Sequence, residues 1–142
     1  MTTTTVYPTR TSLSRNAITV VGATVGALVL WVVETRLLGV DLAVPTGDVV
    51  QPVTGVSVAA TALVAGLAAM LTAWLLTRVA PRGCRTVWTV LASAVLVVSL
   101  LGPLGATSPA AVASLVTLHL LVGLTLVIGL RGSFTTARGY VE

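Results

Sequence analysis

Four long apolar runs alternate with short polar segments along the chain. None of these runs contains a charged residue, and they cover residues 17–33, 56–76, 87–104 and 110–130. A helix rises about 1.5 Å per residue, so about 20 apolar residues cross a hydrocarbon core of about 30 Å. The pattern therefore predicts four transmembrane helices, at about 17–38, 55–77, 87–104 and 109–130.

The polar segments define the ends and the longest connection of this domain. Residues 1–16 are rich in Thr and predict a disordered tail, and residues 132–142 predict a second tail. Residues 39–54 contain Pro, Gly and Asp and predict a loop. A signal peptide is the alternative for the first run, but no small-x-small cleavage site follows it, so we expect a retained anchor. The four-helix domain then covers residues 17–131.

The composition requires lipid as the surrounding medium. The chain has 142 residues, of which 56% are hydrophobic and 8% charged, and its mean hydropathy is +1.04. Water-soluble domains carry about 25% charged residues, which this chain lacks. The expected fold is all-α, an integral membrane bundle of four transmembrane helices. The single cysteine, Cys84, excludes an internal disulfide.

The arginines predict the orientation of the bundle. All eight basic residues are Arg, and short loops rich in Arg stay on the cytoplasmic side. Only Arg36 lies in the first or third expected connection; the others are Arg10, Arg15, Arg78, Arg82, Arg85, Arg131 and Arg138. We therefore expect both termini in the cytoplasm of a bacterial cell and the helices in its plasma membrane. The formal charge of +4 does not predict nucleic-acid binding, because the arginines form no basic stripe.

Small residues repeat at helical spacing in two of the expected spans. Helices pack in lipid where small side chains let their backbones approach. The second span carries the longer stripe, with members Gly55, Ala59, Ala62, Gly66, Ala69 and Ala73. The first span carries Thr19, Gly22, Ala23, Gly26 and Ala27. We expect the two stripes to pack together in antiparallel fashion. The spacing equally fits contacts with a second copy or with another membrane protein.

His119 is the only histidine and lies near the middle of the fourth span. Ionisable groups at membrane depth are candidates for function. We expect a neutral ring that donates one hydrogen bond and accepts another. The polar residues at comparable depth are Thr24, Thr61, Ser93 and Ser99. An interhelical bond that fixes packing is the favoured interpretation, and a proton relay or substrate contact is the alternative.

Two acidic residues follow the first apolar run as further candidates. Glu34 is interpreted as a hydrated residue at the headgroup boundary near Arg36, and the alternative is an inward position at the outer rim of the bundle. Asp41, like Asp48, is most simply a loop or turn residue.

Known catalytic motifs are missing from the chain. It contains no HExxH, GxSxG or Walker sequence, and one His with four carboxylates predicts neither a metal site nor a cofactor site. We expect a non-enzymatic structural or accessory membrane protein. The alternative is an oligomeric small transporter or channel subunit that uses His119 and Glu34.

Several short motifs carry a resemblance to a known family. They are Trp31 and the segments 37–42 (LLGVDL), 100–104 (LLGPL), 118–120 (LHL) and 128–131 (IGLR). In these the chain resembles the domain-of-unknown-function 6069 family, uncharacterised four-pass membrane proteins of high-GC Gram-positive bacteria. The resemblance implies no activity. It does imply that Asp41, the Gly-Pro turn and His119 are worth testing first.

Overall fold

The computed structural model describes residues 10–79 and 83–134, which form a bundle of four long helices. The helices are α1 (Arg10–Val32), α2 (Gly55–Val79), α3 (Cys84–Ser99) and α4 (Pro109–Arg131). Shorter elements are the π-helical turn η1 (Val33–Leu37), the strands β1 (Ala43–Thr46) and β2 (Val49–Pro52), and the 3-10 turns η2 (Gly102–Gly105) and η3 (Gly132–Phe134).

Four segments are long and apolar enough to cross a membrane: Leu13–Leu37, Gly55–Val79, Cys84–Gly105 and Pro109–Arg131. The expected fold class, an all-helical membrane bundle with four spans, is confirmed.

The first helix begins earlier than the sequence pattern predicted. Residues 10–16 of the expected N-terminal tail are helical and continue α1, while residues 1–9 lie outside the described residues. Extending an existing helix adds one hydrogen bond per residue, so a polar segment can join it without apolar periodicity. Asn16 is buried, and the Arg15 guanidinium lies against Gly132 at the end of α4. A cation is favourable at that end of a helix.

Capping residues, Gly and Pro in the sequence mark the start of α4 and the end of α3. At the start of α4, the Ser108 side chain accepts a hydrogen bond from the Ala111 N–H, and Pro109 takes a first-turn position that needs no donor. The α-helical part of α3 stops at Ser99, before the expected end of that span. The 3-10 turn η2, which contains Gly102 and Pro103, completes the crossing. At the other end of the chain, residues 132–134 of the expected second tail form η3, and residues 135–142 lie outside the described part.

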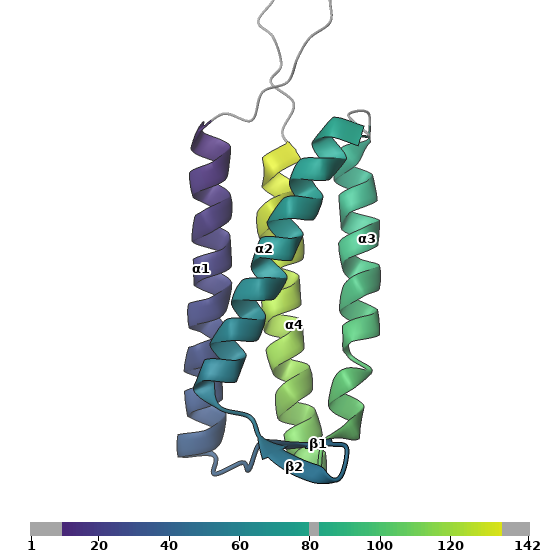
Figure 1. The fold of residues 1–142 in the computed structure, drawn as a ribbon. Coiled ribbons are helices and arrows are strands. Elements are labelled where there is room, and N and C mark those ends of the chain that lie inside the picture. Colours follow the sequence, from purple (N-terminus) through teal and green to yellow (C-terminus); the bar gives the residue numbers. More distant parts are fainter. Residues whose placement is uncertain (1–9, 80–82, 135–142) are drawn as a thin grey trace, which may run out of the picture.

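A small antiparallel β-hairpin crosses the end of the bundle opposite the start of α1 and the end of α4 (Figure 1). Its register pairs Ala43 with Pro52 and Thr46 with Val49. Gly47 supplies a φ of +63°, which a two-residue hairpin turn needs at its first central position. The loop expected over residues 39–54 is therefore largely this hairpin. The prolines in both strands hid it, because Pro weakens any strand pattern.

The helices pack unequally around α4, which contacts the other three. Figure 1 shows α2 leaning across α1 at the hairpin end and meeting α3 only near the opposite end. Two tryptophan side chains hold separate parts of the fold together. The Trp31 Nε1–H donates to the Val53 carbonyl at 3.0 Å, and the Trp88 Nε1–H donates to the Val127 carbonyl at 3.2 Å. The first bond ties α1 to the segment after β2, and the second ties α3 to α4.

Candidate binding site

A cavity of about 850 Å³ lies between α2, α3 and α4, and Ala27 of α1 and Val44 of β1 also line it. Its α2 wall runs from Ser57 to Thr72, which is about 22 Å at 1.5 Å per residue. Ala65 and Ala68 on α2, and Leu91 and Val95 on α3, are exposed although they line this cavity. The cavity is therefore a groove that opens sideways between α2 and α3, and we call it the α2–α3 groove.

Only part of the small-residue surface of α2 packs against α1, and Ala62 and Ala69 of the stripe found in the sequence also line the groove. The stripe found in the sequence includes Ala62, Gly66 and Ala73, which are buried, whereas Ala59 and Ala69 are half-buried. A Cβ on Gly66 would collide with Cγ1 of Val20 on α1, and one on Gly55 would lie 3.1 Å from the Trp31 ring. The neighbouring face of α2 consists of small residues that leave the groove open.

The small-residue stripe expected on α1 does not form one contact face. Gly22 is exposed, and a Cβ there would meet nothing within 4 Å. A Cβ on Gly26 would lie 3.3 Å from Leu121 of α4, not against α2. Val20 forms the close contact with α2, and at 100° per residue Gly22 lies about 200° around the helix from it. The expected antiparallel packing of the two helices is present, but it does not run through Gly22 and Gly26, so that part of the expectation is wrong. Ala23 and Ala27 are buried.

Four hydroxyl side chains line the groove, and each donates to a carbonyl of its own helix or helix start. The Ser57 Oγ–H donates to the Thr54 carbonyl at 2.7 Å, and Thr61 donates to that of Ser57 at 2.7 Å. Thr72 donates to the Ala68 carbonyl at 2.8 Å. These bonds satisfy the hydroxyl donors within lipid. The Ser57 Oγ also accepts from the Thr54 N–H at 3.0 Å, whereas the oxygens of Thr61 and Thr72 keep acceptor capacity.

Ser99 is the fourth hydroxyl, and it shows the same arrangement on α3. Its Oγ–H donates to the Leu96 carbonyl at 2.7 Å. Ser99 and Trp88 belong to the same face of α3, and both line the groove. The Trp88 indole donor is already bonded to Val127, so it is not free for a ligand.

His119 lines the groove from α4 and bonds within its own helix. Its Nδ1 lies 2.7 Å from the Leu115 carbonyl oxygen. A carbonyl can only accept, so Nδ1 carries the proton, and Nε2 of the neutral ring is an acceptor. No bond from another described residue reaches Nε2. The expected interhelical bond from His119 is therefore not formed. Of the polar residues at comparable depth, Thr61 and Ser99 line the same groove. Ser93 is exposed, and Thr24 bonds to the Val20 carbonyl of its own helix.

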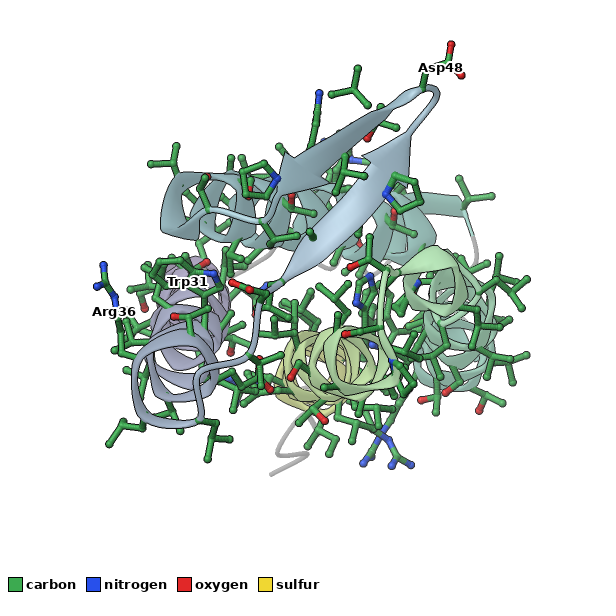
Figure 2. All side chains as sticks on the ribbon, turned by 90° about the horizontal axis from the view of Figure 1, so that it is seen from below. Trp31, Arg36 and Asp48 are labelled. Atoms are coloured by element: carbon green, nitrogen blue, oxygen red, sulfur yellow. The ribbon has the colours of Figure 1, made fainter. Side chains whose placement is uncertain are left out.

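Glu34 lies in the π-helical turn η1 and is 4% exposed. Its Oε2 atom is buried and has no hydrogen-bond partner among the described residues. The interpretation as a hydrated headgroup residue near Arg36 is wrong, because Arg36 is exposed and points away from the bundle (Figure 2). The Leu38 N–H bonds to the Val33 carbonyl, five residues earlier, at 3.0 Å. This widened turn changes the side of the helix on which the Glu34 side chain lies. Turns of this kind are frequent at functional sites.

The remaining acidic candidates lie outside the groove. Asp41 is exposed in the segment between η1 and β1. Asp48 is exposed at the tip of the hairpin, which extends beyond the helices (Figure 2). Neither lines the groove, and Glu34 does not line it either. The structure therefore does not bring Glu34 or Asp41 together with His119.

Comparison with known proteins places the chain in a family. The model of the family of unknown function DUF6069 matches residues 8–136. The chain belongs to this family. No curated protein and no solved structure matches this chain.

Sequence reasoning missed most of the groove of this DUF6069 member. Ala65, Ala68 and Thr72 line it from α2, and they lie beside the stripe that begins at Gly55, of which Ala62 and Ala69 also line the groove. A signal was present, because Thr61, Ala65, Ala68 and Thr72 repeat at spacings of 4, 3 and 4 residues on a second face. The sequence shows that α2 has two faces of small residues, but it does not show which of them packs against another helix.

Proposed function

We propose that this protein is a non-enzymatic accessory membrane protein that holds an apolar molecule in the α2–α3 groove. The cavity of about 850 Å³ carries this proposal. Ligand sites typically measure about 300–1,000 Å³, lie between the helices of bundles, and combine apolar walls with a few polar groups. The groove has this size, this place and this lining. Its side opening would admit a molecule directly from the surrounding lipid.

The lining supports binding better than catalysis or transport. Among the described residues that line the groove, His119 is the only ionisable side chain. Enzymes that use separate acid and base groups place two titratable side chains in one site, and the described lining contains one. A transporter or channel that uses both His119 and Glu34 would need the two along one path, and Glu34 lies outside this lining.

Photolabelling tests the proposed binding. The full chain is placed in lipid nanodiscs with a long alkane that carries a diazirine, and adducts are mapped by mass spectrometry. We expect adducts on lining residues of α2, α3 and α4. Ala65→Trp should fill the groove and lower this labelling, whereas Ala60→Trp should not, because Ala60 is exposed on α2 but outside the lining. Uniform labelling of all lipid-facing surfaces, unchanged by Ala65→Trp, would refute the proposal.

We further propose that both termini lie in the cytoplasm and that the hairpin faces outward in the bacterial plasma membrane. Arg15, Arg78, Arg85 and Arg131 support this, since they lie at the end of the bundle opposite the hairpin. Short loops rich in Arg are retained in the cytoplasm.

Cys84 permits a direct test of orientation, because it is the only thiol of the chain. A membrane-impermeant maleimide should not label it in intact cells and should label it after permeabilisation. In a Cys84→Ser background, Asp48→Cys at the hairpin tip should be labelled in intact cells. The reverse result for the two cysteines would overturn the orientation.

A further inference from the structure

The polar side chains of the groove share a property that restricts the ligand. Ser57, Thr61, Thr72 and Ser99 have all donated their hydroxyl protons to backbone carbonyls. The same holds for the Nδ1–H of His119. A hydroxyl oxygen that donates its proton still has lone pairs, and so has the second imidazole nitrogen. The Ser57 Oγ already accepts from the Thr54 N–H. The described lining has thus used its side-chain donors, and the acceptors that remain are the hydroxyl oxygens of Thr61, Thr72 and Ser99 and Nε2 of His119.

We propose that the groove binds a neutral lipophilic alcohol or phenol, whose O–H donates a hydrogen bond to Nε2 of His119. This inference rests on the proposed function, because it names the ligand class of the same groove. The apolar body of the ligand contacts the alanine and leucine side chains of the walls. Its hydroxyl gives the acceptor at Nε2 a partner that no described residue provides.

Other ligand classes fit this lining less well. Carboxylates and phosphates need donors or positive charge, and the described lining has neither an Arg nor a free side-chain donor. A lipophilic cation would lack a counter-charge, since no carboxylate lines the groove. A plain hydrocarbon would fill the volume but leave the acceptor at His119 unpaired. An ether of equal length also lacks an O–H donor and leaves the acceptor at His119 unpaired, so it is the matched control for the alcohol.

A pair of photoprobes tests this inference on the full chain in nanodiscs. One probe is a diazirine-bearing hexadecanol, and the other is its methyl ether, which keeps the length and loses the donor. One net hydrogen bond corresponds to a preference of about threefold to tenfold for the alcohol. We expect that preference in adducts on the groove lining.

Variants assign the preference to His119. His119→Phe retains a ring and lacks the acceptor, so the alcohol and the ether should label it equally. Thr117→Val is the control, because Thr117 lies on α4, donates to the Ala113 carbonyl at 2.8 Å and is outside the lining. It should keep the full preference. If His119→Phe does not fold, His119→Leu removes the same acceptor with a smaller side chain, and the same loss of preference is expected.

The outcomes separate the two proposals. If both probes label the groove equally in the unmodified protein, the alcohol assignment is wrong and the apolar groove stands. If neither probe labels it above other lipid-facing surfaces, the proposed function itself fails. If labelling is absent and the protein is a dimer cross-linked through α2 and α3, a second copy occupies the groove, and both proposals are overturned.

Discussion

The two sides of α2 differ in how closely they are packed, although both are built from small residues. Toward α1, Gly66 touches Val20 so closely that a Cβ would collide. Toward α3, Ala65 and Ala68 border an open groove. In lipid the hydrophobic effect does not drive helices together, so a small side chain allows contact without enforcing it. Small residues thus have two uses in this bundle: one face gains a close helix contact, and the other leaves room.

The largest loss of stability is expected at Trp88, the buried side chain of α3. Trp88 is 2% exposed, lies 6.0 Å from the Phe134 ring between centroids, and bonds to Val127. Trp88→Ala should lower the free energy of unfolding by about 3–5 kcal/mol, as measured by denaturant titration in detergent micelles. Trp74→Ala is the control, because Trp74 is 38% exposed and stacks only with Arg78. Equal losses would show that Trp88 does not hold α3.

The closely packed side of α2 should not tolerate one added methyl group. Gly66→Ala should cost about 1–3 kcal/mol, because the new Cβ meets the stiff, branched Val20 side chain. Gly22→Ala should cost nothing, since its surroundings are open. Val20→Ala should restore tolerance of Gly66→Ala in the double variant. An additive double variant would contradict the contact.

Loss of the bond between α1 and the hairpin connection should have a moderate effect. Trp31→Phe keeps an aromatic ring beside Gly55 and removes the Nε1–H bond to the Val53 carbonyl. A net hydrogen bond contributes about 0.5–1.5 kcal/mol, and the midpoint of thermal unfolding in micelles should fall accordingly. Proteolysis within the hairpin should also become faster. Unchanged proteolysis would show that this bond does not fix the hairpin.

The smallest effect is expected on the open side of α2. Ala65→Leu adds three carbon atoms toward the groove, where Ala65 is exposed. We expect a change within about 0.5 kcal/mol in the same titration, in contrast with Gly66→Ala one residue later. A loss as large as that of Gly66→Ala would mean that α3 closes over this face.

The sequence predicted the four spans well, because hydrocarbon thickness fixes the length of each apolar run. It offered the inward position of Glu34 only as the alternative, because the π-helical turn that buries this side chain has no composition signal. It also placed Gly22 on the wrong face, since spacing identifies a stripe but not its partner. The hairpin had a usable signal in Gly47 and Asp48 between two valine-containing segments.

The candidate site was only partly predictable. His119 was recognised because an ionisable group at mid-membrane depth is unusual. Its environment was not, because the groove results from the tilt of α2 relative to α3, and tilt is set by contacts with neighbouring helices. The shared acceptor character of Thr61, Thr72 and Ser99 could be seen only from the hydrogen bonds of the folded chain.

The divergence of α2 and α3 toward the hairpin is the central claim, and pulsed electron spin resonance measures it most directly. In a Cys84→Ser background in nanodiscs, one pair of spin labels is placed at Ala60 and Leu101, near the hairpin end. A second pair is placed at Leu75 and Val87, near the opposite end, and all four positions are exposed. The open groove predicts a clearly longer distance for the first pair. Equal distances would mean that the helices run side by side, and the groove with its proposed ligand would not exist.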